Sequence, residues 1–409
     1  MWSAERTDEW LRSHRDDLVE LTRELVAFAS ENRPPDGNEG PCQELVAARL
    51  HEAGAEVDVF RPDEVEAAVA HPLWWPGRSY QGRPCVVGRR SGAGGGRSLL
   101  LSGHVDVVPA LGEGAHGFWD GDVEDGRLYG RGAWDMKAGV ACALHAYRCL
   151  AECDVALAGD VIVESVVDEE FGGANGTLAA RLRGYHADGA VLSEPTGMTV
   201  CHATRGGIQY RLTVAGGALG MGFEGDGGPG ALTTLARISA ALDDLPRDAP
   251  LLQYLLRSGE ELPWGTAEGL PGDGVLEFWA EITPGTDRAA VDAELRAAVD
   301  AVVPEGIDVR WEQRTRFLEA ADVGAESPIV QRMRAALGTP DAAPAMAPFA
   351  CDAFIFAVDG TPVVICGPRG GNAHAPDEWV LIEDLYSLSE AFVRLAIDWC
   401  GEVGADDGN

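Results

Sequence analysis

The sequence predicts an α/β fold with a largely parallel sheet, interrupted by a small inserted α+β domain. Between residues 85 and 192, short apolar runs alternate with helix-like stretches, which is the pattern of strands joined by crossover helices. After Arg205 the pattern changes to polar–apolar alternation with a glycine-rich loop, and later the first pattern resumes. We therefore expect one domain formed by residues 1–205 and 317–409, and an inserted domain at residues 206–316. A chain of 409 residues is long enough for two such cores.

Helical and strand periodicities define the expected elements one by one. Apolar residues at helical spacing predict a single helix over 7–30, and a second helix follows at 39–53. The other helices of the first domain are expected at 137–152, 175–182, 327–337 and 381–398, and its strands at 57–60, 85–88, from Leu99, at 161–167, 189–192 and 363–365. In the inserted domain, three strands of an antiparallel sheet alternate with two helices, at 208–214, 231–245, 274–282, 287–301 and 307–316.

Composition limits the partners and the compartment. The net charge of −34 argues against nucleic acid or an anionic membrane surface as a partner, because Lys and Arg are what bind phosphate groups. Such a charge serves solubility, although an acidic field could also gather cationic substrates. The sequence shows no apolar run of about 18 residues and no secretory signal, so we expect a cytoplasmic protein. The nine cysteines include no Cys-x-x-Cys pair, which favours buried, reduced thiols.

Charged side chains follow the predicted strands at their carboxyl ends, where ligands bind in α/β sheets. His104 and Asp106 are two residues apart and point the same way on a strand, so the carboxylate can orient the imidazole of a metal ligand. A surface pair is the alternative. Asp135 lies between a glycine-flanked turn and a helix, where an Asp either caps the helix or bridges two metal ions.

Glu169 and Glu170 are neighbours after a strand and face different directions, so one could ligate a metal while the other acts as a general base. Adjacent glutamates at a strand end are otherwise ordinary surface charge. Glu194, held extended before a proline, and His374, in a glycine-rich loop, complete the set. Two histidines and several carboxylates suit one or two Zn²⁺ ions, with Co²⁺ or Mn²⁺ as substitutes. The combination predicts a two-metal hydrolase.

Five segments carry a resemblance to a known family: Ser102–Pro109, Gly130–Lys137, Asp168–Gly173, Ser193–Thr196 and Asn372–Glu378. In these segments and their order, the chain resembles the co-catalytic zinc amidohydrolases. That family includes acetylornithine deacetylase, succinyl-diaminopimelate desuccinylase, aminoacylase and a carboxypeptidase that cleaves glutamate from folates. The resemblance implies a zinc-hydrolase catalytic domain with an inserted, dimerisation-type lid. It also implies hydrolysis of the amide bond of an N-acyl amino acid or N-acyl amine, and Glu194 in place of Asp resembles the deacetylase and desuccinylase branch.

The same resemblance assigns a role to each candidate residue. The metal ligands would be His104 on one zinc, His374 on the other, Asp135 as the bridge, and Glu170 and Glu194 as the remaining ligands of the two ions. A cis peptide bond would join Asp135 to Met136, and Asp106 would orient His104. Glu169 would take a proton from the attacking water and pass it to the leaving amine.

The inserted domain departs from the family pattern. A His and an Asn of family lids correspond to Gly220 and Leu232, and an Arg that binds a substrate carboxylate is replaced by Glu281. Loss of that Arg removes a charge-assisted hydrogen bond worth about 1.5–3 kcal/mol. We therefore expect an unusual substrate, which lacks a carboxylate or carries a positive charge. The candidates for substitute donors and substrate contacts are Arg205, His202, Asn372 and Glu281 itself.

Two alternatives to hydrolysis stay open. One is a family member repurposed for non-hydrolytic, metal-dependent chemistry in a biosynthetic pathway. The other is a metal-free binding or scaffold protein, against which the complete ligand set argues. The partner expected for an amidohydrolase is a small N-acyl molecule, and the resemblance implies a homodimer formed through the lid.

Overall fold

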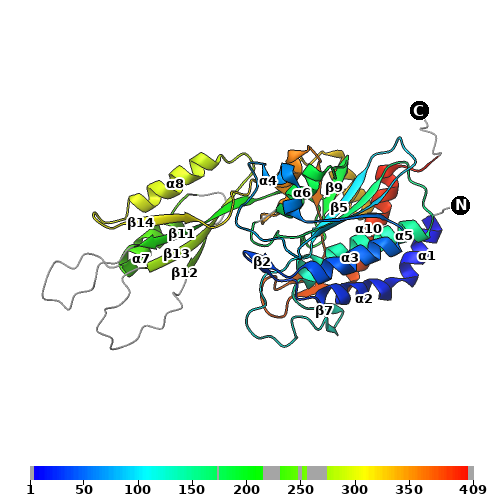
Figure 1. The fold of residues 1–409 in the computed structure, drawn as a ribbon, viewed down its shortest axis with the longest axis horizontal. Helices are drawn as coiled ribbons and strands as arrows, with labels where there is room; N and C mark the ends of the chain where they lie inside the picture. The colour runs from blue at the N-terminus through cyan, green and yellow to red at the C-terminus, as the bar shows by residue number, and fades with distance from the viewer. Residues whose placement is uncertain (1–3, 173–174, 215–230, 247–250, 256–273, 404–409) are drawn as a thin grey trace. The chain divides into compact units, whose positions relative to one another are not determined.

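In the computed structural model, the chain divides into two compact units. The described residues are 4–172, 175–214, 231–246, 251–255 and 274–403. The first unit comprises Met1–Thr204 and Asp322–Asn409, and the second, the inserted unit, comprises Arg205–Ala321 (Figure 1). The predicted fold class is confirmed: the first unit is an α/β domain and the inserted unit is an α+β domain.

The central sheet of the first unit has eight strands in the order β15-β10-β16-β9-β5-β8-β4-β3. Their bounds are β3 Glu56–Phe60, β4 Cys85–Arg90, β5 Leu99–His104, β8 Val161–Val166, β9 Gly189–Leu192, β10 Cys201–Thr204, β15 Ala345–Ala347 and β16 Val363–Ile365. The four middle strands β16, β9, β5 and β8 are parallel. Every residue of β5 and β8 is buried, as expected for parallel strands that are covered on both faces.

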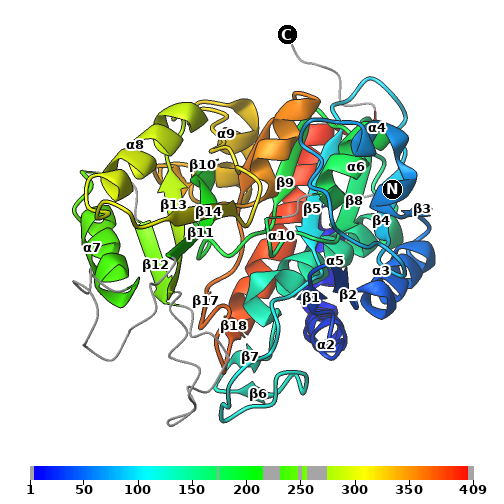
Figure 2. The ribbon, with the colours of Figure 1, turned by 60° about the vertical axis from the view of Figure 1, so that its left-hand side comes forward.

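Helices cover this sheet. They are α1 Ala4–Ser13, α2 Arg15–Val26, α3 Gly40–Glu52, α4 Glu66–Val69, α5 Ala138–Glu152, α6 Asn175–Arg183, α9 Pro328–Ala336 and α10 Ile382–Cys400, with the short elements η1 Pro62–Glu64, η2 Ala133–Lys137 and η3 Asp352–Val358. Figure 2 shows α5 and α10 side by side along the sheet, and both contact β5. The prediction of one helix over 7–30 is wrong, because the chain leaves helical geometry at His14, whose φ is −111° and ψ is 21°.

Two small sheets shape the loops at one edge of the first unit. One pairs β1 Asn32–Arg33 with β2 Asp36–Gly37. The other has the order β17-β18-β7-β6, with bounds β6 Val123–Glu124, β7 Arg127–Tyr129, β17 Gly370–Gly371 and β18 Trp379–Leu381. Because β18 pairs with β7, the loop after β17 is brought beside the segment that follows β7. These two segments contain His374 and Asp135 respectively.

The inserted unit is a four-stranded antiparallel sheet in the order β12-β13-β11-β14, with two helices. The bounds are β11 Gly206–Val214, α7 Ala231–Asp243, β12 Leu251–Leu255, β13 Gly274–Ile282, α8 Arg288–Asp300 and β14 Val309–Gln313. Alternate residues of β11, from Ile208 to Val214, are buried and pack with Phe278 and with Ile238 and Leu295 of the helices. The predicted strand–helix pattern is confirmed and β12 is an additional strand. The predicted glycine-rich loop at 216–230 lies outside the described residues.

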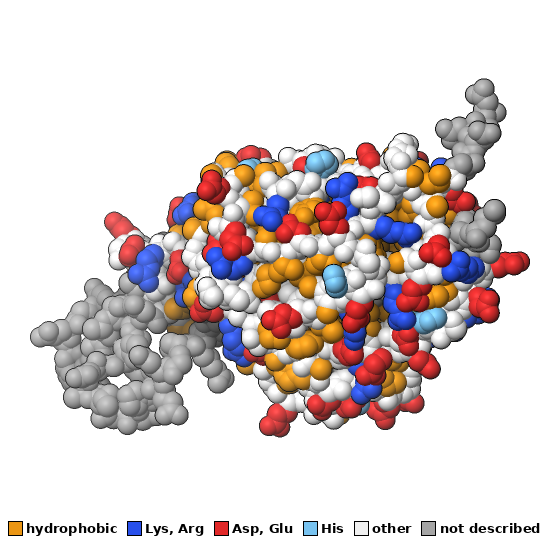
Figure 3. All heavy atoms as spheres, turned by 45° about the vertical axis from the view of Figure 1, so that its right-hand side comes forward, with side chains coloured by type: hydrophobic (Ala, Val, Ile, Leu, Met, Phe, Trp, Pro, Cys, Tyr) orange, Lys and Arg blue, Asp and Glu red, His pale blue; other side chains and the backbone are white. Residues whose placement is uncertain are grey.

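The burial of the thiols agrees with the expectation from composition. Figure 3 shows acidic side chains spread over the visible face, with Lys and Arg between them. All nine cysteines lie within the described residues, and each is buried and free. Among the described helices, none combines the length and apolar character that a membrane span requires.

Candidate metal centre

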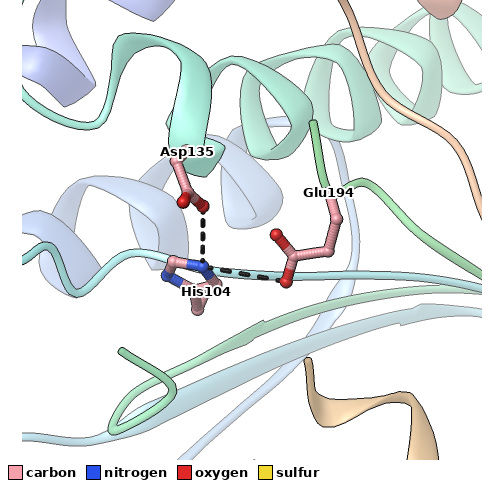
Figure 4. Close-up of side chains that lie close together, drawn as sticks. All are labelled: His104, Asp135 and Glu194. Carbon is pink, nitrogen blue, oxygen red and sulfur yellow. Dashed lines mark ion pairs between the residues drawn. The ribbon is translucent and has the colours of Figure 1, made fainter. Parts of the chain in front are cut away.

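The predicted ligand residues gather at the carboxyl ends of neighbouring strands. His104 is the last residue of β5, Glu170 follows β8, and Glu194 follows β9. Asp135 lies within η2, immediately before α5, and His374 lies in the loop between β17 and β18. Figure 4 shows His104, Asp135 and Glu194 converging from three separate segments. The parallel topology thus brings together side chains that are far apart in the sequence.

The five ligand residues form two groups that share Asp135. In the first, Nε2 of His104 lies 3.4 Å from Oδ1 of Asp135 and 3.8 Å from Oε1 of Glu194 (Figure 4). In the second, Nε2 of His374 lies 3.1 Å from Oδ2 of Asp135 and 3.0 Å from Oε2 of Glu170. Within each group the candidate ligand atoms lie within 4.8 Å of one another. Asp135 therefore presents one oxygen to each histidine.

Buried atoms without partners indicate that the first group is built for a cation. Nε2 of His104 and Oε1 of Glu194 are buried, and neither has a hydrogen-bond partner among the described residues. Buried polar atoms nearly always have partners, so this pair needs a ligand. Nδ1 of His104 donates to the backbone oxygen of Asp106 at 2.9 Å, which leaves the Nε2 lone pair for a metal. The nitrogen and oxygen donors fit a divalent ion such as zinc.

The electrostatics of the site point the same way. Burial, together with the neighbouring carboxylates, raises the pKa of Glu194 well above its ordinary value. The pKa of Glu169 is raised well above its ordinary value, chiefly by burial. The charge of Glu170 raises the pKa of His374 to about 11. Acidic groups crowded in this way hold protons tightly unless cations replace those protons, and the two ligand groups are where cations would bind.

Glu169 belongs to neither ligand group, although Oε2 of its carboxylate lies 3.7 Å from Nε2 of His104. The turn that carries Glu169 and Glu170 is held by Asp106, whose Oδ2 accepts hydrogen bonds from both backbone N–H groups at 3.0 and 3.1 Å. The Asp106 carboxylate lies 3.7 Å from Nδ1 of His104, so the atom that orients the imidazole is the backbone oxygen of the same residue.

Glu378 is a site residue that the sequence reasoning did not single out. Its buried carboxylate accepts hydrogen bonds from the backbone N–H groups of Trp134 and Asp135 at 3.0 and 3.1 Å, and from Arg131 at 2.7 Å. It thereby fixes the segment in which the peptide bond from Asp135 to Met136 is cis, as the resemblance implied. Its position four residues after His374, in the same motif, was the available signal.

Each residue proposed for a substrate contact has a polar partner within its own unit. Nη1 of Arg205 donates to Oε2 of Glu281 at 2.7 Å within the inserted unit. Asn372 is exposed and donates to the backbone oxygen of Asp377 at 3.1 Å. Nδ1 of His202 lies 2.9 Å from Oδ1 of Asp322. Leu232 is exposed on α7, and Gly220 lies outside the described residues.

A parallel α/β sheet whose strand ends carry two His–carboxylate groups joined by one Asp defines a metal-dependent hydrolase. The model of peptidase family M20/M25/M40 matches residues 100–398. The chain therefore belongs to this family, and it is an amidohydrolase, as the resemblance implied.

Three known proteins show how far the similarity extends. An N-formyl-4-amino-5-aminomethyl-2-methylpyrimidine deformylase of Bacillus subtilis (strain 168) is 26% identical over 440 residues, which cover 95% of this chain and 96% of that protein. A succinyl-diaminopimelate desuccinylase of Methylobacterium sp. (strain 4-46) is 31% identical over 333 residues, or 73% of this chain and 80% of that protein. The crystal structure of human carnosine dipeptidase 1 has a TM-score of 0.71 at 16% identity and covers 96% of this chain and 99% of that one, a likeness of fold.

Proposed function

We propose that this protein removes a short acyl group from an N-acyl amine that lacks an α-carboxylate, with zinc in the two ligand groups and Glu169 as general base. The observation that carries the proposal is the place of Glu169. Its carboxylate lies beside the first ligand group, 3.7 Å from Nε2 of His104, and belongs to neither group. A carboxylate in that position can accept and donate protons.

Each residue of the centre has a defined task in this reaction. His104 and Glu194 would hold one ion, His374 and Glu170 the other, and Asp135 both. Bound divalent ions lower the pKa of water and polarise an amide carbonyl. Glu169 receives the proton of the attacking water and delivers it to the nitrogen of the leaving amine, so the product leaves as a neutral amine.

Glu281 stands where the family resemblance expects an Arg that binds a substrate carboxylate, and its pairing with Arg205 inside the inserted unit supports a substrate without that carboxylate. A guanidinium binds a carboxylate through strong charge-assisted hydrogen bonds, and Nη1 of Arg205 makes such a bond to Oε2 of Glu281 at 2.7 Å. The same pairing offsets the negative charge of Glu281 and so weakens the case for a cationic substrate. The Bacillus subtilis relative, which this chain matches over nearly its full length, is named for a formamide of an aminomethylpyrimidine. We therefore propose formyl or another short acyl group on the aminomethyl nitrogen of a neutral heteroaromatic compound.

A substrate panel tests this proposal. The purified protein, loaded with Zn²⁺, is assayed for release of primary amine from an N-formyl aminomethylpyrimidine, N-succinyl-diaminopimelate and N-acetylornithine. We expect kcat/KM for the formamide to exceed that for either amino-acid substrate by about tenfold or more, because a lost charge-assisted hydrogen bond of about 1.5–3 kcal/mol corresponds to that factor. Faster turnover of the two carboxylate substrates would contradict the proposal.

The same assay separates the remaining alternative. Consumption of the amide without release of an equivalent of amine would favour non-hydrolytic chemistry. Dialysis against a chelator should abolish turnover, and added Zn²⁺ should restore it. A homodimer formed through the inserted unit stays a prediction, which sedimentation velocity can test.

A further inference from the structure

Behind the turn that carries Glu169 and Glu170 lies a buried polar network with no task in the reaction described above. Its centre is Asp168, a fully buried residue with a φ of +70°. Oδ2 of Asp168 accepts a hydrogen bond from the hydroxyl of Tyr80 at 2.7 Å, and Oδ1 accepts one from Nδ2 of Asn32 at 3.4 Å. The same Asn32 nitrogen donates to Oδ2 of Asp106 at 2.9 Å.

The segment from residue 71 to 82, which we name the tryptophan loop after Trp74 and Trp75, holds this turn at both ends. At the start of the turn, Tyr80 bonds to Asp168. At its end, Nη2 of Arg78 donates to the backbone oxygen of Phe171 at 3.2 Å, and Nε of the same side chain lies 3.4 Å from Asp168. Glu169 and Glu170 lie between these two attachments.

The Tyr80 hydroxyl is itself fixed. It accepts a hydrogen bond from Nδ2 of Asn175 at 2.7 Å, and the Trp74 ring packs at 5.7 Å between ring centroids. Only 1% of Tyr80 is exposed, so water does not replace its bond to Asp168. A buried carboxylate that loses such a donor shifts or recruits another partner, and the adjoining turn then moves with it.

We propose that Tyr80 is a positioning residue, which acts through Asp168 to hold the Glu169 carboxylate and the Glu170 ligand in their working orientations. For Glu169 the inference rests on the proposed function, whereas for Glu170 it concerns metal binding alone. The tryptophan loop is then part of the catalytic apparatus, although it supplies no ligand and no reacting atom.

The test is the variant Tyr80→Phe, which keeps the ring and removes the hydroxyl. Metal binding is followed by Co²⁺ titration and visible absorption, with each binding step assigned to its group by the variants His104→Ala and His374→Ala. We expect Co²⁺ affinity to fall about 10- to 100-fold in the group that contains Glu170 and to stay within about twofold in the group that contains Glu194. With the best substrate of the panel, kcat should fall about 10- to 100-fold while KM changes less than about twofold.

Tyr147→Phe is the matched control, since Tyr147 is 1% exposed and its hydroxyl has no hydrogen-bond partner among the described residues. The proposal would be overturned if kcat fell equally in Tyr80→Phe and Tyr147→Phe, or if Tyr80→Phe weakened both Co²⁺ binding steps equally. Wild-type Co²⁺ affinities and kcat in Tyr80→Phe would also overturn it. If Tyr80→Phe does not fold, the variant Arg78→Met removes the second attachment of the turn, the bond to the backbone oxygen of Phe171, while keeping an apolar stem. The same changes in Co²⁺ affinity and kcat are then expected, and the same results would overturn the proposal. Because Co²⁺ titration needs no substrate, it remains decisive if the proposed deacylation fails.

Discussion

Asp135 is the residue on which the arrangement of the centre depends. Its two carboxylate oxygens face His104 and His374, which belong to different ligand groups. Its own position depends on Glu378, which binds the backbone N–H of Asp135 and the Arg131 side chain. The Glu378 and Arg131 side chains form an ion pair in which each is only 1% exposed, so water does not screen their attraction.

Removal of the Glu378 charge should therefore destabilise the protein strongly. In Glu378→Gln, Arg131 keeps a buried charge without its counter-ion, and we expect the free energy of unfolding to fall by about 3–5 kcal/mol. Guanidinium denaturation followed by circular dichroism measures this change. The control is Asp398→Asn, which breaks the exposed pair with Arg332 and should cost less than about 1 kcal/mol. A similar fall in the free energy of unfolding in both variants would show that the buried ion pair contributes no more to stability than the exposed one.

At the scale of elements, α5 connects the centre to the helical layer. It begins directly after the Asp135 segment, and its residue His145 is buried against α10 and the α1–α2 junction. Nδ1 of His145 lies 2.8 Å from Oγ of Ser389, and Nε2 donates to the backbone oxygen of His14 at 3.0 Å. Burial lowers the pKa of His145 to about 4, although the hydrogen bond to the backbone oxygen of His14 opposes this shift; the charges of Arg148 and His14 lower the pKa further and that of Asp17 raises it.

This depressed pKa predicts a loss of stability in mild acid. The folded state keeps His145 neutral down to about pH 4, whereas the unfolded chain binds a proton below about pH 6.5, so unfolding takes up a proton between these values. The free energy of unfolding should drop by about 3 kcal/mol more in the wild type than in His145→Gln as pH falls from 7 to 4. The exposed His186→Gln serves as control. Parallel curves for the wild type and His145→Gln would refute the assignment.

Local sequence patterns were sufficient to predict an element where the residues of that element alone indicate its structure. The apolar run from Leu99 followed by His104 predicts both the buried strand β5 and the ligand at its end. The break at His14 has no such signal, because neither Gly nor Pro is present and the apolar spacing continues from Leu11 to Leu18. There the His14 ring stacks on Trp10 at 4.0 Å, a contact that periodicity does not encode.

Long-range contacts account for the rest of what sequence reasoning missed. The bond from Tyr80 to Asp168 spans 88 residues, and the bond from Glu378 to Asp135 spans 243. Neither residue type is distinctive in isolation, because a buried Tyr and an acidic residue near a turn are both common. The pairing of Arg205 with Glu281 likewise follows from the register of β11 and β13, in which Gly206 lies opposite Ile282.

At the scale of the whole molecule, the fold gathers one centre from segments that are distant in the chain. The Asp135–His374 contact alone joins residues 239 positions apart. The match to the family model, over residues 100–398, covers every segment that contributes a residue to the centre. The net charge of −34 is not confined to the site, because acidic side chains are spread over the face that Figure 3 shows.

The central claim is that adjacent glutamates have separate tasks, Glu170 holding a metal ion and Glu169 moving a proton. The most direct test measures bound zinc per chain and turnover in Glu169→Gln and Glu170→Gln, with the exposed Glu66→Gln as control. The account predicts that Glu169→Gln keeps the zinc content of the wild type while kcat falls about 10²- to 10⁴-fold, and that Glu170→Gln loses zinc. Loss of zinc from Glu169→Gln, or undiminished turnover in that variant, would contradict it.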